Sequence, residues 1–96
     1  MMSVYFVMIR QQTTDPAALA EYGPRASLAV QGHLLKPLAA YGTLDHLEGD
    51  EVEAAVILEF PDMAAARAWY DSPSYQSALK YLHAGSKAMA FFLEGI

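Results

Sequence analysis

The sequence predicts an α+β fold whose strands and helices follow one another in the order β-α-β-β-α-β. Four short segments carry the apolar, β-branched and aromatic residues typical of strands. Two segments with helical spacing of apolar residues separate them, and Asp15-Pro16 and Pro61-Asp62 stand at their starts. This order is the split-βαβ or ferredoxin-like arrangement, in which two helices cover one face of a four-stranded antiparallel sheet.

The first strand is predicted over residues 3–10, where both faces are apolar, with Val4, Phe6 and Met8 on one and Tyr5, Val7 and Ile9 on the other. Asp15 is expected to cap the first helix, with Pro16 in its first turn. Leu19, Tyr22, Ala26, Ala29 and Val30 then keep one helical phase across Gly23-Pro24. Pro24 lacks an N–H, so we expect a kinked helix or two abutting pieces, ending at Gly32.

The middle of the chain is expected to form a hairpin. A second strand is predicted over about residues 38–48, with Gly42 at a bulge or bend inside it. Residues 49–51 form a charged turn, and residues 53–60 form the third strand. These two strands should pair antiparallel.

The last third of the chain is expected to hold a broken helix and the fourth strand. Asp62 should cap a helix that runs to about residue 70, where Asp71-Ser72-Pro73 interrupts it. Ser72 can cap the second piece, whose buried stripe is Tyr75, Ala78, Leu79 and Leu82. Gly85 stops this piece, and residues 87–94 form a strand that is apolar on both faces. One domain over residues 1–96 is therefore expected.

Composition excludes several functional classes. The chain has six Lys and Arg against eleven Asp and Glu, a net charge of -5, and its basic residues form no stripe that could follow a nucleic acid. The chain has no cysteine, which excludes disulfides, thiolate metal sites and cysteine nucleophiles. The apolar run at residues 1–9 is too short to cross a bilayer and lacks the features of a secretory signal. We expect a cytoplasmic protein with neither nucleic acid nor membrane as partner.

The apolar strand faces predict a homodimer. Two helices can cover one face of the sheet, yet the first, third and fourth strands are apolar on both faces, and 54% of all residues are hydrophobic. A two-fold dimer with sheet packed on sheet would bury the second face.

Several motifs resemble a known bacterial family. They are Glu59-Phe60-Pro61, the run Ala66-Arg67-Ala68-Trp69-Tyr70-Asp71-Ser72-Pro73-Ser74-Tyr75-Gln76, Asp15-Pro16 followed by Glu21-Tyr22, and Leu47-Glu48-Gly49-Asp50. Together they resemble the domain of unknown function 1330 family, in the dimeric α+β barrel superfamily. The chain departs at Leu34-Leu35, where such proteins often carry a Gly-Gly pair.

The resemblance implies the fold and the dimer, while the family itself has no generally assigned activity. Its superfamily includes cofactor-independent monooxygenases, isomerases, cyclases, haem peroxidases and effector-binding domains. Fold alone does not choose among these functions.

Three candidate catalytic residues stand out. His46, on a predicted strand near Glu48, could act as a general base, or be an exposed polar residue. Glu59 interrupts an apolar strand, so it lies either at the rim of the sheet or buried with a partner. Arg67 could pair with such a buried Glu59, or pair with Asp71 at the surface. His33, His46 and His83 show no metal-ligand spacing, so neither a metal nor another cofactor is predicted.

Four tyrosines are candidates for substrate binding. If a cavity lies between helices and sheet, the hydroxyls of Tyr22, Tyr41, Tyr70 and Tyr75 could orient a polar substrate there; otherwise these rings pack in the core. Ser72 resembles a nucleophile only in isolation, and beside Pro73 it fits a cap.

Two functions are consistent with these residues. One is an enzyme that works without a bound cofactor on a small hydrophobic or aromatic metabolite, by proton transfer or oxygenation. The other is a non-catalytic small-molecule-binding or structural dimer, whose own aromatic side chains could fill the cavity.

Overall fold

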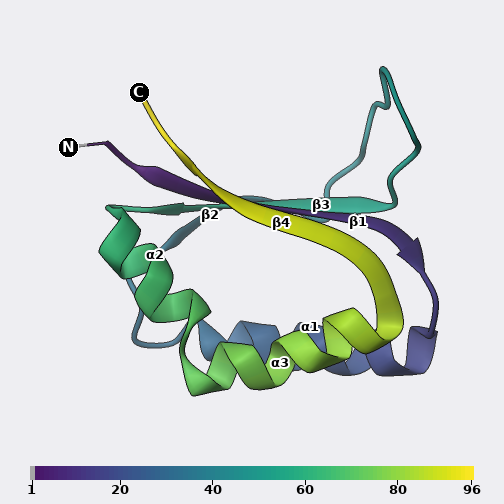
Figure 1. Cartoon of the computed structure of the whole chain (residues 1–96), viewed down its shortest axis with the longest axis horizontal. Helices are drawn as coiled ribbons and strands as arrows, with labels where there is room; N and C mark the ends of the chain where they lie inside the picture. The colour runs from purple at the N-terminus through teal and green to yellow at the C-terminus, as the bar shows by residue number, and fades with distance from the viewer. Residues whose placement is uncertain (1) are drawn as a thin grey trace.

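The computed structural model describes residues 2–96 and shows a four-stranded antiparallel sheet with three helices on one side (Figure 1). The elements follow the predicted order, with the second helical segment broken in two. They are β1 (Val4–Thr13), α1 (Pro16–Ala29), β2 (Lys36–Ala40), β3 (Ala54–Phe60), α2 (Met63–Tyr70), α3 (Pro73–Gly85) and β4 (Ser86–Glu94). The predicted α+β, ferredoxin-like class is confirmed.

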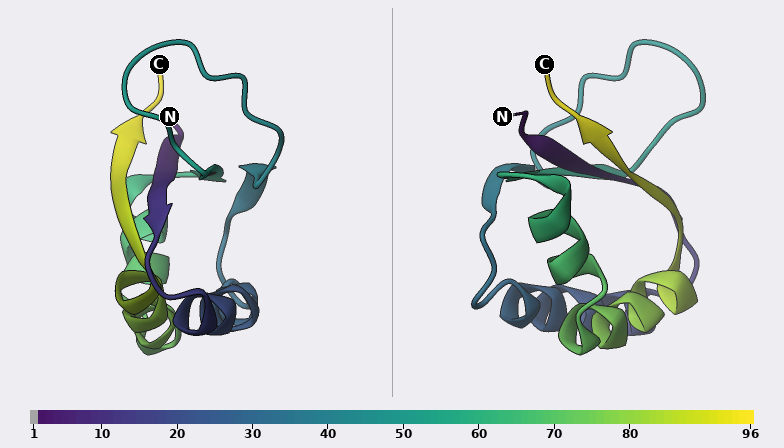
Figure 2. Two further views of the ribbon diagram at one scale, coloured as in Figure 1. Left: turned by 90° about the vertical axis from the view of Figure 1, so that its right-hand side faces the viewer. Right: turned by 60° about the vertical axis from the view of Figure 1, so that its left-hand side comes forward.

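The sheet has the strand order β2-β3-β1-β4, so β1 is paired on both edges. Phe6 of β1 lies opposite Leu58 of β3 and Phe92 of β4, and Val7 faces Ile57 and Phe91 in the same way. Paired residues share a face of the sheet, so the inward and outward rows run across all three strands. Helices α1 and α3 lie side by side beneath the inward face in all three views (Figures 1 and 2).

The core lies between the inward face and the helices. Its largest fully buried side chains are Met8, Phe60 and Tyr75. Trp69 sits at the centre of an aromatic cluster, with ring centroids 5.0 Å from Phe6, 5.4 Å from Phe60 and 4.2 Å from Tyr75. Such contacts contribute about 0.5–1.5 kcal/mol per pair beyond the burial of area.

The predicted helix caps are confirmed. The carboxylate of Asp15 accepts from the N–H groups of Ala17 and Ala18 at 3.1 and 3.4 Å, and that of Asp62 accepts from Ala65 at 2.8 Å. The hydroxyl of Ser72 accepts from the N–H of Tyr75 at 3.3 Å, which makes it the cap of α3 and confirms the break before Pro73.

Helix α1 is continuous through Pro24, so the alternative of two abutting pieces is not observed. A helical residue before proline normally suffers a clash between its Cβ and the proline ring. Gly23 has no Cβ, which explains how the helix passes this point.

The second strand is shorter than predicted. It covers Lys36–Ala40 and not residues 38–48, and residues 41–53 form an irregular loop. Tyr41 ends the strand because its φ of 58° lies in the left-handed region, which turns the chain out of the sheet. The predicted strand position of His46 is therefore wrong. In contrast, β1 runs past Arg10 to Thr13, where it pairs with Ser86 after a bulge.

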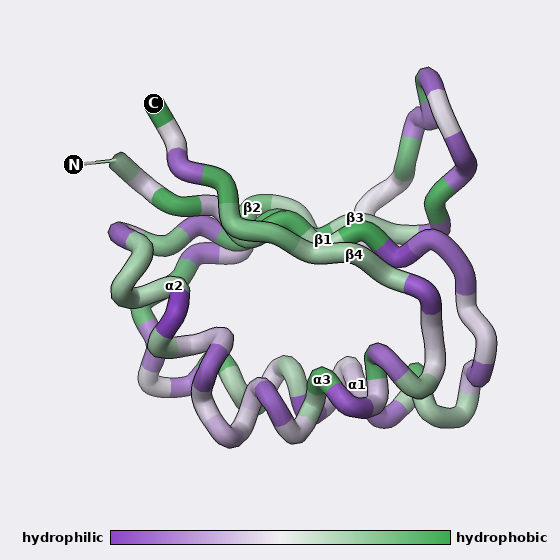
Figure 3. Tube along the Cα trace, viewed as in Figure 1, coloured by the Kyte–Doolittle hydropathy of each residue, from purple (hydrophilic) through white to green (hydrophobic). Residues whose placement is uncertain are grey.

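The outward face of the sheet carries apolar side chains with no helix over them. Met89, Phe91 and Leu93 of β4 are exposed there, beside the half-buried Val7 and Ile57. Figure 3 shows the hydrophobic colour along most of the length of these strands. We call this surface, formed by Tyr5, Val7, Ile9, Ala55, Ile57, Met89, Phe91 and Leu93, the open face.

Candidate functional site

A cavity of about 250 Å³ lies between α1 and strands β1, β2 and β3. Tyr22 and Ala26 of α1 line it from one side, and Met8 and Val56 from the sheet. Trp69 of α2 and Tyr75 of α3 also contribute to its wall. None of the described residues that line it carries a charge.

The cavity exists because α1 presents small residues to the sheet at this point. Gly23, Ala26 and Ser27 line it from the helix, and Ala40 lines it from β2. A Cβ placed on Gly23 would meet no atom within 4 Å, apart from its own chain neighbours and the helix backbone. Larger side chains at these positions would fill the space, so the cavity depends on the small residues of α1.

Two buried tyrosine hydroxyls meet at the cavity. The hydroxyls of Tyr22 and Tyr75 are 2.8 Å apart, and either can donate. Burial raises the pKa of Tyr22 from 10.0 to about 12, and burial also raises the pKa of Tyr75. Both phenols therefore stay protonated at neutral pH. Their mutual hydrogen bond uses one O–H, which leaves the other O–H free to donate to a ligand.

Tyr41 stands at the exposed side of the cavity. Its side chain lines the cavity although half of it is open to solvent. The guanidinium of Arg10 lies 5.9 Å from the centroid of its ring. Partial burial raises the pKa of Tyr41, and the charge of Arg10 opposes that rise. A left-handed φ in a non-glycine residue is a strained conformation, and such strain is concentrated at functional sites.

Trp69 contributes ring surface and not a hydrogen bond. Its Nε1 is buried and has no partner among residues 2–96, so a molecule in the cavity cannot reach it without a movement of side chains. Trp69 is the only tryptophan in the chain, which makes its fluorescence a specific reporter of this cavity.

The structure brings three of the predicted substrate-binding tyrosines together: Tyr22, Tyr41 and Tyr75 all line the cavity. Tyr70 lies elsewhere, beside Phe92 in a second hollow between α2 and β4. Sequence reasoning missed Trp69, Ala26 and Ser27 as lining residues. The signal that could have found Ala26 is its small size in the inward phase of α1.

The three candidate catalytic residues are not brought together, and none of them lines the cavity. His46 lies in the exposed loop, where its Nε2 is 2.8 Å from the carbonyl oxygen of Gly49. Glu59 lies half-buried on the outward side of β3, opposite Tyr5 and Lys36 in the register of the sheet. It forms no ion pair within the part of the chain that the structure describes.

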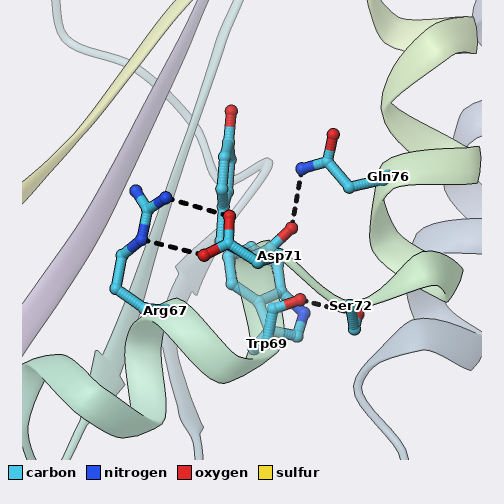
Figure 4. A network of polar contacts seen from close by, with 6 residues as sticks. Arg67, Trp69, Asp71, Ser72 and Gln76 are labelled. Carbon is cyan, nitrogen blue, oxygen red and sulfur yellow. Dashed lines mark hydrogen bonds and ion pairs between the residues drawn. The ribbon is translucent and has the colours of Figure 1, made fainter.

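Of the two partners considered for Arg67, the structure shows Asp71. Arg67 donates to both oxygens of Asp71, at 3.1 and 2.9 Å, on the exposed side of α2 (Figure 4). The same region is tied by the hydroxyl of Ser72, which donates to the carbonyl of Trp69 at 2.7 Å, and by Gln76, which donates to the carbonyl of Tyr70 at 2.7 Å. The bonds of Ser72 and Gln76 join the end of α2 to the start of α3, next to Trp69 and Tyr75.

Two further observations concern metals and membranes. Among residues 2–96 no three side chains of His, Asp or Glu lie close enough together to hold a metal ion. In the same residues no helix has both the length and the apolar character needed to cross a bilayer.

Comparison with known proteins matches residues 3–96 to a family described as "Domain of unknown function (DUF1330)". No curated protein matches the sequence. A protein of unknown function from Rhodopseudomonas palustris has a similar structure, with a TM-score of 0.73 at 17% identity over 99% of this chain and 83% of that one.

Two other solved structures extend the comparison. A dimeric ferredoxin-like protein of unknown function from Thermobifida fusca has a TM-score of 0.68 at 17% identity over 99% of this chain and 92% of that one. SnoaB, a cofactor-independent oxygenase from Streptomyces nogalater, has a TM-score of 0.66 at 17% identity over 97% and 92%. At such identities the likeness shows the fold.

Proposed function

Because the chain belongs to the DUF1330 family, whose description assigns no activity, we propose a function from the cavity itself. The protein is a homodimer that binds a small hydrophobic or aromatic metabolite between α1 and the sheet, without a bound cofactor. The proposal places it in the cytoplasm, as expected from the sequence. One observation carries the proposal: an uncharged, largely apolar cavity holds the buried hydroxyl pair of Tyr22 and Tyr75.

The size of the cavity limits the ligand. An apolar cavity of about 150 Å³ accepts benzene. At about 250 Å³ the space suits one ring with substituents, or two fused rings. Sites for small molecules combine apolar walls with a few polar groups that orient the ligand, and the tyrosine pair is such a group.

The chemistry of the lining favours donation of hydrogen bonds. The free O–H of the pair would contact an oxygen of the ligand and stabilise negative charge that develops there. Such charge develops when a proton leaves the carbon beside a carbonyl, and the enolate formed in this way is the electron-rich species that reacts with dioxygen. SnoaB, which shares the fold, is a cofactor-independent oxygenase, and this supports the enzyme function by analogy only.

His46, Glu59 and Arg67 remain proposed catalytic residues. His46 belongs to the loop that projects on the side of the sheet away from the helices (Figure 1), and Glu59 belongs to the outward row of β3. A second copy packed on the open face would lie against this side. The cavity lies on the other side of the sheet, so a catalytic role for either residue requires a ligand that reaches the outward side, next to the proposed dimer interface.

The open face supports the dimer. A row of exposed apolar side chains on β4, continued by half-buried ones on β1 and β3, is larger than the scattered apolar residues of an ordinary surface. Similar solved structures include dimeric ferredoxin-like proteins. Packing one open face on another would bury both at once.

Fluorescence of Trp69 tests ligand binding directly. Titration with α-tetralone, a two-ring aromatic ketone, should change this fluorescence with a saturable dependence. Ala26→Phe fills the cavity from α1 and should abolish the response, whereas Ala20→Phe on the exposed side of the same helix should preserve it. Equal binding to the two variants, measured by calorimetry, would place the ligand outside the cavity. No saturable binding by the wild-type protein to α-tetralone, indole or tetralin would contradict the proposed ligand class.

The alternative, a binding protein without catalysis, is favoured by the absence of a charged group among the described residues that line the cavity. Turnover of a bound ligand by the wild-type protein separates the two functions, and His46→Ala and Glu59→Gln then test these two residues. Loss of turnover with unchanged affinity supports the enzyme. Unchanged turnover in both variants removes these two residues from the mechanism.

A further inference from the structure

The loop over residues 41–53, here called the arm, projects from the sheet on the side away from the helices (Figures 1 and 2). Every residue of the arm from Tyr41 to Glu51 is exposed. Irregular loops longer than about 12–15 residues are uncommon and usually functional, and the arm reaches this length. Between its two ends the arm is exposed and stands beside the open face (Figures 1 and 2).

The arm carries apolar side chains where solvent would favour polar ones. Leu47 is 84% exposed and Leu44 is 41% exposed. Between and after them stand acidic residues: Asp45, Glu48, Asp50 and Glu51. An apolar pair rimmed by charge is typical of a surface that binds a partner.

A second copy of this chain offers a complementary surface. Its open face would supply apolar area for the leucines of the arm. Lys87 lies two residues before Met89 in β4, and Lys36 lies opposite Glu59, so both lysines belong to the outward phase of the sheet. The acidic residues on the arm of one copy and the lysines on the outward side of the other copy carry opposite charges, and both would lie at the margins of the same interface.

The base of the arm is fixed to the sheet. The N–H of Glu53 donates to the carbonyl of Arg10 at 2.8 Å, and the Nε of Arg10 lies 3.1 Å from the Glu53 carboxylate. The hydroxyl of Thr13 donates to the same carboxylate at 2.6 Å, and this bond is the main reason that the pKa of Glu53 lies below its usual value. The end of the arm next to β3 is therefore held in place.

The other end of the arm is Tyr41, which also lines the cavity. Its N–H donates to the carbonyl of Ala55 at 3.1 Å, while its ring stays near Arg10. Arg10 thus contacts both ends of the arm. The position of the arm and the shape of the cavity opening depend on the same residue.

We propose that the arm docks on a second copy of this chain, with Leu44 and Leu47 against its open face, and that docking holds Tyr41 over the cavity. The inference rests on the dimer proposed above and adds a coupling between dimer formation and ligand binding. Dimer formation closes the cavity, and by thermodynamic reciprocity a ligand in the cavity tightens the dimer.

Sedimentation of the double variant Leu44→Ser, Leu47→Ser tests the docking. Both arms of a two-fold dimer lose their leucines, so we expect the dimer dissociation constant to rise about tenfold for each arm, or about 100-fold. The control Leu28→Ser removes a leucine of α1 whose exposure, 66%, lies between those of Leu44 and Leu47, and it should leave the constant unchanged. Because these leucines are exposed, circular dichroism should show that the variants remain folded.

Quenching of Trp69 by acrylamide tests the coupling without any ligand. The quenching constant should rise several-fold when the wild-type protein is diluted below its dimer dissociation constant. The variant Tyr41→Gly, which accepts the left-handed conformation but lacks the ring, should show the high constant while still a dimer.

The outcomes separate the proposals. A dimer that is equally tight with and without the arm leucines overturns the docking and leaves the proposed dimer standing. A quenching constant that is the same in monomer, dimer and Tyr41→Gly overturns the coupling. A wild-type protein that stays monomeric at all concentrations removes both the dimer and the arm interface, and leaves ligand binding to its own test.

Discussion

Removing one hydroxyl of the Tyr22–Tyr75 pair should lower the free energy of unfolding by more than the net contribution of a single hydrogen bond. The two oxygens are 2.8 Å apart, and their side chains are 6% and 1% exposed. A net hydrogen bond contributes about 1 kcal/mol, but a buried hydroxyl left without a partner costs about 1–3 kcal/mol. We therefore expect Tyr22→Phe and Tyr75→Phe each to lower the free energy of unfolding by about 1–2 kcal/mol.

The double variant Tyr22→Phe, Tyr75→Phe tests whether the two hydroxyls act as a pair. Once both hydroxyls are gone, neither is stranded, so the double variant should be about as stable as either single one. Urea unfolding of the four proteins gives the coupling energy, and Tyr81→Phe is the control, because its hydroxyl bonds to nothing among residues 2–96 and its change should stay within about 0.5 kcal/mol. If the effects of the two single variants simply add, the hydroxyls do not act as a pair and the reasoning fails.

The same pair predicts a loss of stability in alkali. Burial raises the pKa of Tyr22 from 10.0 to about 12, so the folded state holds its proton more tightly than the unfolded state does. The stabilisation is complete below about pH 10 and is lost as the pH rises towards 12. At about pH 11 the titration of Tyr22 should lower the free energy of unfolding by about 1 kcal/mol. The pKa of Tyr75 is raised as well, so its titration acts in the same direction. The double variant should lack this part of the decline of the unfolding free energy with pH. An identical decline in the wild-type protein and the double variant would show that the phenols titrate normally.

Three shorter predictions follow from other contacts. Gly85→Ala would place a Cβ 2.5 Å from the backbone nitrogen of Leu19, so urea unfolding should show a loss of about 1–3 kcal/mol, and an unchanged midpoint would contradict the close approach of α1 and α3. Arg67→Ala removes the exposed pair with Asp71 and the contact of the guanidinium with the ring of Tyr70, so the same assay should show a loss of less than about 2 kcal/mol. Phe91→Glu places a charge on the open face, and light scattering should show a monomer; an intact dimer would place the interface elsewhere.

Local signals in the sequence were sufficient for most of the fold. The caps Asp15, Asp62 and Ser72 act on backbone groups two or three residues away, so their role can be predicted without knowledge of tertiary structure. The end of β2 could not be predicted in this way. It depends on the left-handed backbone of Tyr41, a residue type that gives no warning of such a conformation.

The candidate site shows the same limit. Tyr22 and Tyr75 could be placed in the inward phases of their helices, but their contact depends on how α1 and α3 cross, which no local pattern encodes. His46 could be proposed as a general base beside Glu48 only while residues 38–48 were predicted to be a strand. The structure places His46 in the loop after β2, and neither His46 nor Glu59 lines the cavity.

The pairing of β1 with β4 also bears on how the protein reaches its fold. Val4 lies opposite Glu94, so the central strand finds one of its two neighbours almost a whole chain length away. Pairings between such distant segments require the closure of a long loop and slow the folding of a protein. Until β4 arrives, one edge of β1 has unpaired backbone groups between two apolar faces, a state prone to aggregation. We therefore expect the pairing of β1 with β4 to be the slow and aggregation-prone step in the folding of this protein.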